Sequence, residues 1–395
     1  MKPDCDVLIS GGGLVGLSLA CELATKHMSV RVLEAAPPYE APSLEGLRVS
    51  AINPRSQALL DALGAWQSIA PPFCSPFERM RVWDEAVTPF GDRALEFSGA
   101  DCGVTPLGHI VHNDALQWSL YQQASAHERI ELVFNSMLEE VVHERDGVRV
   151  FDTGHAQHTA RLLVGADGMR SQVRALQAIK VVQKSYAQQG IVCTLRPEHG
   201  HERTAWQRFL STGPIALLPL ASGDVSVVWS LDNEAADSVK ALDDDAFCAA
   251  VTDACDGVLG GLTLTSQRAT FPLGLLRAER YVGPRVALIG DAAHVVHPLA
   301  GQGVNLGFGD VAELAGALDA GRERGDGVGD QLALRQYERA RKYENRKMQM
   351  TIDALHHMFT QSQPVLRQGR SLGMGLLNNW PGVKSLLARE ALGTR

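Results

Sequence analysis

A glycine-rich turn near the start of the chain constrains the fold more than any other feature of the 395-residue sequence. The turn reads Gly11-Gly12-Gly13-Leu14-Val15-Gly16 and follows an apolar run over residues 7–9. A helix-forming stretch to about residue 27 and a second apolar run over residues 30–33 complete a βαβ pattern that closes on Glu34. This order of elements predicts a parallel sheet of the dinucleotide-binding type.

Each position of this pattern has a physical role. Gly11 permits the tight turn, Gly13 lets the backbone approach a pyrophosphate, and Gly16 allows the helix to pack closely on the strand. The helix N-terminus offers free N–H groups and its dipole to the anion. Glu34 lies 34 − 16 = 18 residues after the last glycine, where a carboxylate can accept both hydroxyls of an adenosine ribose. An acid at this position disfavours a 2′-phosphate, so we expect FAD or NAD rather than NADP.

Two more aliphatic runs end in turns rich in glycine and aspartate. Residues 162–164 lead to Gly165-Ala166-Asp167-Gly168, and residues 286–289 lead to Gly290-Asp291. An aspartate directly after a buried strand can accept hydrogen bonds from a polyol while backbone amides face the neighbouring phosphates. We therefore expect all three runs in one nucleotide-binding sheet assembled from distant parts of the chain. A simple helix cap is the alternative for either loop.

Composition excludes several classes of protein. Lys and Arg number 37 against 45 Asp and Glu, a net charge of −8, so we expect no nucleic-acid binding. The seven cysteines are scattered and form no C-x-x-C pair, which predicts free thiols in a reducing compartment. No apolar run reaches the length of a membrane span. We expect a cytoplasmic protein, with peripheral contact at the inner face of the membrane left open.

Taken together, the chain resembles the single-component FAD-dependent aromatic hydroxylases, whose signatures are an N-terminal G-x-G-x-x-G, a central Asp-Gly and a C-terminal Gly-Asp. It is most similar to the ubiquinone-biosynthesis ring hydroxylases of the UbiH/UbiF/VisC group. That similarity rests on residues 290–306 and on residues 186–189, 205–209 and 213–220.

Pattern and resemblance together predict an α/β fold with an α+β insert. Alternating apolar residues between 186 and 229 are typical of an antiparallel sheet, and helix formers dominate after residue 330. We predict a discontinuous Rossmann-like FAD-binding domain over residues 1–75, 100–180 and 283–329. An interleaved antiparallel-sheet substrate domain would comprise residues 76–99 and 181–282, and a C-terminal helical region would comprise residues 330–395.

The resemblance implies a set of cofactor contacts. The glycine turn and Glu34 would hold the ADP half of FAD, Arg48 would lie over its phosphate and ribityl side, and Asp291 would bind the ribityl chain. Asp167 would serve both FAD and the reduced nicotinamide, and residues 298–305 would pass beneath the isoalloxazine. A helix N-terminus near Asn305 would stabilise negative charge on reduced flavin. The implied cofactor-binding residues are Gly11, Gly13, Gly16, Glu34, Arg48, Asn113, Asp167, Asp291, Pro298, Gly301, Gly303, Val304 and Asn305.

One segment departs from the group's pattern. Where the group usually has Glu-Asn-Arg, this chain has His112-Asn113-Asp114. A carboxylate in place of a cation, beside an anionic cofactor, weakens the case for a contact from this segment. Asn113 is kept as a candidate.

The resemblance also implies the reaction. NAD(P)H would reduce the flavin, O₂ would add to give a C4a-hydroperoxide, and its distal oxygen would hydroxylate the ring of a prenylated phenol or quinone precursor in ubiquinone biosynthesis. A cofactor is required because protein side chains cannot activate dioxygen. The alternatives are an FAD-dependent oxidoreductase of the same fold, such as a geranylgeranyl-type reductase, and a non-catalytic flavoprotein assembly subunit.

Two polar residues and a group of apolar residues are the candidates for catalysis and substrate binding. His297, with a pKa near neutrality, could hydrogen-bond the flavin or help to deprotonate a phenol, with Gln302 beside it; a packed loop histidine is the alternative. His294, His297 and Asp291 lack a fourth ligand at suitable spacing, so we expect no metal site. An apolar cavity would draw on residues that a sheet core also demands. These are Trp206, Phe209, Leu217, Pro219 and Trp229.

A basic stretch after residue 334 suggests a docking face. Residues 335–347 contain six cations and two carboxylates, Glu338 and Glu344, so the net charge of this stretch is 6 − 2 = +4. An apolar stretch over residues 372–377, followed by Trp380, lies further along the chain. Such a pairing suits a membrane surface or other ubiquinone-biosynthesis proteins. The alternative is a solvated helix packed on the FAD-binding domain. The cations are Arg335, Arg339, Arg341, Lys342, Arg346 and Lys347.

Overall fold

The computed structural model describes residues 3–297 and 303–360. Its first large sheet has a parallel centre in the order β19-β11-β1-β2-β8, and β18, β10 and β9 extend it with antiparallel pairs. The three predicted runs therefore lie on adjacent parallel strands, which confirms that prediction. The strands are β1 (Cys5–Ser10), β2 (Val30–Glu34), β8 (Ile130–Phe134), β9 (Leu138–His143), β10 (Val148–Asp152), β11 (Gln157–Gly165), β18 (Val282–Gly283) and β19 (Val286–Leu288).

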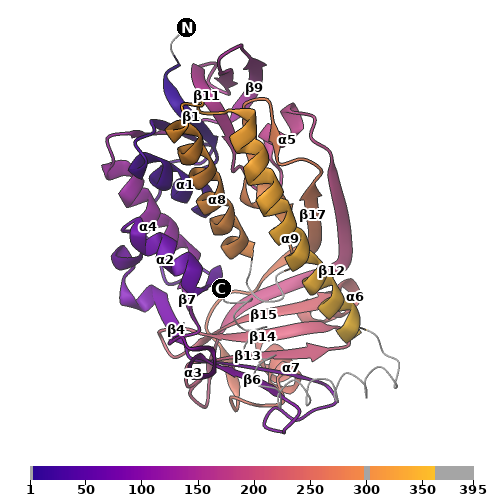
Figure 1. Ribbon diagram of the computed structural model, residues 1–395. Helices are drawn as coiled ribbons and strands as arrows, with labels where there is room; N and C mark the ends of the chain where they lie inside the picture. The colour runs from indigo at the N-terminus through magenta and orange to yellow at the C-terminus, as the bar shows by residue number, and fades with distance from the viewer. Residues whose placement is uncertain (1–2, 298–302, 361–395) are drawn as a thin grey trace.

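Helices cover this sheet because they present apolar faces to its buried strands. Leu19 and Leu23 of α1 (Leu14–Thr25) share one core with Val311 and Leu314 of α8 (Gly303–Glu323). Each of these side chains is completely buried, so each contributes roughly 1.5–3 kcal/mol of apolar transfer free energy. Helix α4 (Asn113–Ala126) packs against α1 (Figure 1).

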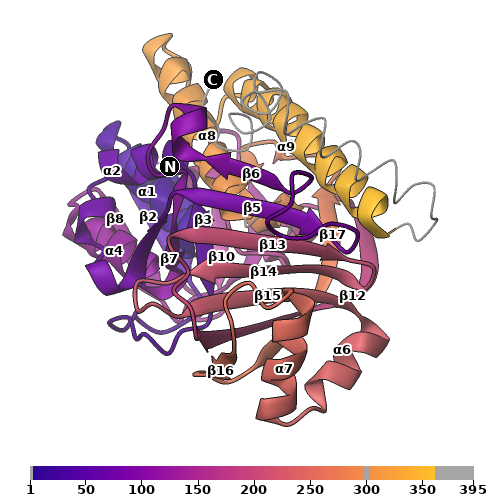
Figure 2. The same cartoon turned by 90° about the horizontal axis from the view of Figure 1, so that it is seen from below.

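The second large sheet is antiparallel except where β5 runs parallel to β13. Its order, β20-β17-β12-β15-β14-β13-β5-β6, with β16 beside β12, confirms the predicted antiparallel insert. Helices α6 (Asn233–Lys240) and α7 (Asp244–Ala254) lie against it (Figure 2). The strands are β5 (Arg79–Asp84), β6 (Leu95–Ser98), β12 (Val181–Pro197), β13 (Thr204–Leu210), β14 (Gly213–Pro219), β15 (Val225–Asp232), β16 (Leu262–Leu264), β17 (Ala269–Ala278) and β20 (His294–Val295).

The chain passes from one sheet to the other directly after the third nucleotide loop. β19 belongs to the parallel sheet, whereas β20 pairs with β17 through Val295 opposite Leu276 and His294 opposite Arg277. The segment 283–329, predicted to lie wholly in the FAD-binding domain, therefore contributes β20 to the antiparallel sheet.

A small third sheet, β3-β7-β4, completes the strands. Asn53 caps the helix that follows β3, since its side chain accepts a hydrogen bond from the Ser56 N–H at 2.8 Å. The remaining elements are β3 (Val49–Ile52), β4 (Cys74–Phe77), β7 (Gly108–His112), α2 (Pro54–Ala62), α3 (Gly99–Cys102), α5 (Gln172–Leu176) and the 3₁₀ turns η1 (Trp66–Ser68), η2 (Pro71–Phe73) and η3 (Gly290–Ala292).

The long helix α9 (Gln331–Thr360) runs beside α8 from the first sheet to the second (Figure 1). It confirms the predicted C-terminal helical region as far as residue 360, and residues 361–395 lie outside the described part. One face of α9 is buried through Leu334, Tyr337 and Arg341. Within residues 3–297 and 303–360, no helix is both long enough and apolar enough to cross a bilayer.

Candidate functional site

Three loops meet at one edge of the parallel sheet because β1, β11 and β19 are neighbours and end on the same side. The backbone links them: the Ala166 N–H donates to the Ser10 carbonyl at 2.8 Å, and the Ile289 N–H donates to the Gly165 carbonyl at 3.0 Å. Gly11 has a φ of 104°, and a Cβ there would lie 2.5 Å from the Ala166 carbonyl oxygen. Only glycine permits this approach of the first loop to the second.

The glycine turn fits a dinucleotide. A Cβ on Gly16 would lie 2.0 Å from the Gly11 carbonyl oxygen, so glycine is needed there for the close helix-to-strand packing. A Cβ on Gly13, by contrast, would meet no atom within 4 Å. Gly13 caps α1, so open space lies at a helix N-terminus, where backbone N–H groups favour phosphate.

Glu34 ends β2 with its carboxylate turned toward the glycine turn. Its Oε2 accepts the Gly12 N–H at 2.6 Å and its Oε1 accepts the Ala36 N–H at 2.8 Å. Each oxygen retains a second lone pair for a ribose hydroxyl. Sequence reasoning missed two neighbours, Tyr39 and Gln117, which donate to the Gly12 carbonyl at 2.5 and 3.3 Å. They lie far along the chain from the turn, and no motif marks them.

Asp167 in the second loop carries an unmet acceptor. Its Oδ2 accepts the Val173 N–H at 3.0 Å, at the start of α5. Its Oδ1 is buried and has no hydrogen-bond partner among the described residues. A buried carboxylate oxygen without a donor is costly, so its place beside the glycine loops fits a hydroxyl or N–H from a bound cofactor.

The third loop brings Asp291 close to Arg48. The Asp291 side chain is exposed to solvent but protein atoms crowd around it, and this desolvation raises the pKa of its carboxyl. His294 and Arg48 oppose the shift, and the buried Asp310 adds to it. Arg48 lies just before β3, so the small third sheet delivers a cation to a loop of the parallel sheet. A cation beside a carboxylate suits a ligand that carries both phosphates and hydroxyls.

Two predicted cofactor residues use their side chains within the protein. The Asn113 Oδ1 accepts the Ser50 Oγ hydroxyl at 2.7 Å, and the Asn305 Nδ2 donates to the Ala51 carbonyl at 2.7 Å. Both amides therefore hold β3, the strand that follows Arg48. Gly303 and Val304 begin α8 together with Asn305, and a Cβ on Gly303 would meet nothing within 4 Å. Pro298, Gly301 and Gln302 lie outside the described residues.

The departure at residues 112–114 has a local explanation. Asp114 lies in the first turn of α4, where the helix dipole favours a carboxylate. Its Oδ2 lies 2.5 Å from the position that a Cβ on Gly46 would take, so the Asp114 carboxylate packs against the backbone at Gly46. His112 is buried, and burial lowers its pKa.

His297 is completely buried and reaches the antiparallel sheet. Its Nε2 lies 3.4 Å from the Oε1 of Gln188, and its ring meets Tyr186 edge-on with 5.1 Å between centroids. Gln188 and Tyr186 belong to β12. The histidine singled out from the cofactor loop therefore lies at the boundary between that loop and the predicted substrate domain.

The predicted cavity residues are divided between two faces of the antiparallel sheet. Arg208 shares a face with Trp206, and its Nη1 donates at 3.1 Å to the Asp253 and Ala254 carbonyls at the end of α7. Trp206 pairs with Leu217, and Trp229 pairs with Ile215, so these side chains face α7 as well.

Alternation along the strands shows which face of the sheet the other two candidates, Pro219 and Phe209, occupy. Pro219 lies two residues after Leu217 and faces α7 too, whereas Phe209 lies one residue after Arg208 and faces the opposite side. Leu217 and Trp229 pack in one core with Phe247 of α7. Period-two alternation thus places four of the five candidate residues on the α7 side of the sheet and Phe209 on the opposite side, so the five do not line one common cavity.

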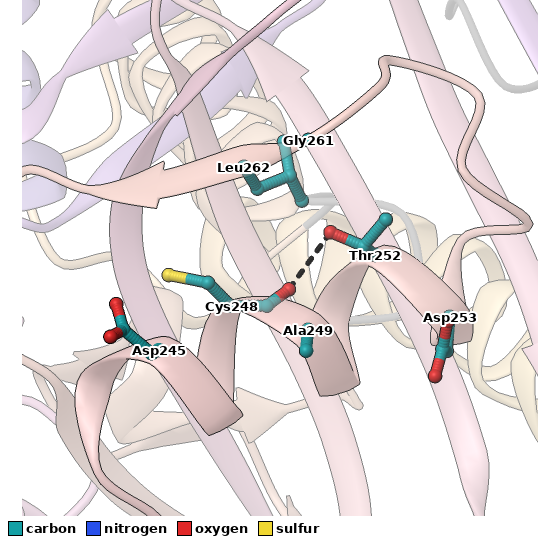
Figure 3. A pocket seen from close by; sticks show the side chains of 7 residues that line it. All are labelled: Asp245, Cys248, Ala249, Thr252, Asp253, Gly261 and Leu262. Atoms are coloured by element: carbon teal, nitrogen blue, oxygen red, sulfur yellow. Dashed lines mark hydrogen bonds between the residues drawn. The ribbon is translucent and has the colours of Figure 1, made fainter.

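A surface hollow of about 340 Å³ lies between α7 and β16 (Figure 3). None of the residues predicted to bind cofactor or substrate lines it. The Thr252 hydroxyl in its wall donates to the Cys248 carbonyl at 2.8 Å. The lining residues are Asp245, Cys248, Ala249, Thr252, Asp253, Gly261 and Leu262.

The known proteins that match this chain include an FAD-binding family, in agreement with the dinucleotide site described above. A family described as "FAD binding domain" matches residues 4–351. The ubiquinone biosynthesis monooxygenase COQ6 of Xenopus tropicalis is 35% identical, with 96% of this chain and 91% of the relative covered. The 3-demethoxyubiquinol 3-hydroxylase of Escherichia coli (strain K12) is 33% identical, with 98% of both chains covered.

One solved structure extends the comparison to the fold. The p-nitrophenol 4-monooxygenase PnpA from Pseudomonas putida DLL-E4 superposes with a TM-score of 0.79 and full coverage of both chains, at 19% identity. The shared fold comprises the parallel sheet, the antiparallel sheet and the helices that join them.

Proposed function

Because the chain belongs to the FAD-dependent monooxygenases, in the group of ubiquinone-biosynthesis ring hydroxylases, we propose that it hydroxylates the ring of a prenylated phenol or quinone precursor. NAD(P)H is the reductant and O₂ the oxidant. In the complete reaction one oxygen atom converts a ring C–H into C–OH, the other leaves as water, and NAD(P)H supplies two electrons as hydride.

The observation that carries the proposal is the passage of the chain from β19 through η3 to β20. Asp291 stands among the cofactor loops, and three residues later His294 pairs with Arg277 of the antiparallel sheet. A ring bound against that sheet thus lies close to a cofactor held by the loops. Proximity of this kind is the protein's main contribution to reactions that a cofactor performs.

FAD, when bound, supplies the activation of dioxygen that side chains lack. The glycine turn and Glu34 would hold its ADP half, and Asp167, Arg48 and Asp291 would hold the phosphates and hydroxyls nearer the flavin. The free N–H groups at the start of α8 and the positive end of its dipole would favour negative charge on a cofactor bound beside them. His297 is excluded from water and can hold or accept a proton at the edge of the substrate sheet.

The test uses purified protein, FAD, each reduced nicotinamide in turn, and 2-geranylphenol as a short-tailed prenylphenol. We expect one ¹⁸O atom from ¹⁸O₂ in the phenolic product, with nicotinamide and oxygen consumed in equal amounts and little peroxide released. A product that gains hydrogen without oxygen would indicate a reductase of the same fold. A bound flavin that neither nicotinamide reduces would indicate an assembly subunit.

We also propose that the outer face of α9 contacts an anionic bilayer, because a prenylated substrate resides in lipid. Three exposed cations, Arg335, Arg339 and Arg346, follow one stripe of the helix, and none of them forms an ion pair with another described residue. Leu332 and Tyr343 interleave with them and are 55% and 70% exposed. A cationic stripe that carries apolar side chains is typical of helices that lie on membranes.

The structure corrects the choice of cations for this face. Arg341 is buried, so it cannot contact lipid, and Lys342 pairs with Glu338 at 2.8 Å while donating to the Glu279 carbonyl. The +4 counted from the sequence thus overstates the charge offered to a partner. Residues 372–377 and Trp380 lie outside the described part. Docking on other ubiquinone-biosynthesis proteins is the alternative use of the same stripe.

A further inference from the structure

An irregularity in β12 lies directly beside His297. Opposite β17, Ser185 pairs with Gly274 and the next paired residue is Gln188 with Leu273, so Tyr186 and Ala187 are extra residues in β12. Ala187 adopts a φ of 53°, a left-handed conformation that disfavours L-residues by roughly 1–2 kcal/mol. Bulges are common next to active sites, where they redirect side chains. The strained backbone of Ala187 is the energetic cost of this bulge.

The bulge sets both neighbours of the imidazole. Tyr186 packs its ring edge-on against His297 with an interplanar angle of 78°, and Gln188, buried on the same strand, reaches the imidazole Nε2. Room for the Gln188 amide depends on Gly213, where a Cβ would lie 3.2 Å from the amide Nε2 and 2.2 Å from the Ser230 carbonyl oxygen.

The orientation of the Gln188 amide follows from its second partner. Its Nε2 lies 3.4 Å from the Thr212 carbonyl, which can only accept, so the nitrogen must be on that side. The amide Oε1 then faces the His297 Nε2 at 3.4 Å. An oxygen acceptor requires a hydrogen on the nitrogen opposite it, so in neutral His297 the hydrogen is on Nε2 and the lone pair on Nδ1.

We propose that Gln188 is a positioning residue that holds His297 in the tautomer whose Nδ1 accepts the proton of the substrate's phenol hydroxyl. The inference rests on the proposed function and assigns this side chain a role in it. In the step, the phenol O–H bond breaks, an Nδ1–H bond forms, and the oxygen keeps the electron pair. The resulting phenolate ring is richer in electrons and so more reactive toward an oxygen donor, and the imidazolium returns its proton when the product is released.

The experiment compares the FAD-loaded parent with Gln188→Met, which keeps the length and apolar volume of the side chain but removes the acceptor. Gln189→Met is the matched control, since Gln189 is the next residue of β12 and its amide binds Asn233 on the other side of the strand. The readouts are the ¹⁵N shifts of the His297 ring, identified by their loss in His297→Gln, and the kcat and KM for 2-geranylphenol hydroxylation.

We expect the parent to show a protonated Nε2 and an unprotonated Nδ1, and the control to match it. In Gln188→Met the ring nitrogens should move toward the average of two tautomers, and kcat should fall about tenfold or more while KM changes little. Complete loss of a general base removes roughly 10²–10⁴-fold. Gln188→Glu, which restores an acceptor, should recover the tautomer and part of kcat.

Three results would overturn the inference or its premise. An unprotonated Nε2 in the parent contradicts the assignment directly and needs no variant to fold. A parent that hydroxylates the phenol and a Gln188→Met variant with unchanged kcat overturn the role of Gln188 alone. A parent that binds FAD but forms no hydroxylated phenol overturns the proposed function, and the proton-accepting role falls with it.

Discussion

The guanidinium of Arg341 on α9 lies with its Nε 2.7 Å from the carboxylate of Asp310 on α8, and both side chains are buried. The other carboxylate oxygen accepts the Gly290 N–H at 2.9 Å and lies 2.6 Å from the His294 Nε2. One buried pair therefore connects the C-terminal helix to the backbone of the loop that carries Asp291.

Removal of Arg341 should destabilise the fold strongly. Arg341→Ala leaves the Asp310 charge buried without its partner, which typically costs about 3–5 kcal/mol. Arg339→Ala removes an exposed cation from the same helix and should change the free energy of unfolding by no more than about 0.5 kcal/mol. Denaturant unfolding of both variants measures the difference. Equal stabilities would mean that the buried pair contributes nothing beyond an exposed charge.

The stability conferred by Asp310 should depend on pH. Burial raises the pKa of this carboxyl, but His294 and Arg341 outweigh burial and lower it to about 2 from the usual 3.8. A carboxyl whose pKa is lower in the folded state than in the unfolded state contributes its full stabilisation of the fold above about pH 4. This contribution to the free energy of unfolding is lost as the pH falls toward 2. The parent should exceed Asp310→Asn in stability at pH 5, and the gap should narrow by roughly 2 kcal/mol toward pH 2. A gap that does not change with pH would contradict the shift.

Glu34 should contribute directly to FAD affinity. Glu34→Ala removes an acceptor of charge-assisted hydrogen bonds and should weaken FAD binding by roughly 1–3 kcal/mol. Glu34→Gln keeps one acceptor and should lose less. Quenching of FAD fluorescence by apoprotein gives both dissociation constants. Unchanged FAD affinity in Glu34→Ala would remove this residue from the site.

Asp291 should bind cofactor without supporting the fold. The side chain is exposed, so Asp291→Ala should unfold at a denaturant concentration close to that of the parent while purifying mostly as apoprotein. Flavin absorbance per protein and a chemical unfolding curve separate the two effects. If this variant retains full flavin content and turnover, the third loop has been assigned wrongly.

The α9 stripe should govern binding to anionic lipid. Reversal of charge at Arg335, Arg339 and Arg346 should reduce recovery on phosphatidylglycerol vesicles and slow turnover of a long-tailed phenol, with a short-tailed phenol unaffected.

The control for this experiment carries the same change in net charge elsewhere on the surface. The exposed cations Arg55 on α2, Arg129 before β8 and Lys180 before β12 all lie outside α9, and their reversal should leave vesicle recovery near that of the parent. If both triple variants lose recovery equally, total charge rather than α9 is responsible.

The sequence predicted what local chemistry determines. Glycine spacing and an acid in register identify the first loop because the backbone geometry of a pyrophosphate site allows few alternatives. Leu217 and Trp229 were candidates for either a cavity wall or the sheet core, and they pack in the core with Phe247 of α7. Composition could not separate the two roles, because it does not say which face of a strand meets α7. The burial of Arg341 was also missed, because its partner Asp310 lies 31 residues away on another helix.

The two-residue pairing of β20 with β17 has a consequence for exchanging parts between relatives. A chimera that replaces residues 181–282 alone would set a foreign β17 against the native β20 and would separate Gln188 from the His297 with which it is matched. Grafts intended to alter ring selectivity should therefore carry residues 294–297 together with the insert. Because β5 pairs with β13 of the insert and β6 pairs with β5, the smallest exchangeable module also includes residues 79–98 and thus comprises three segments of chain.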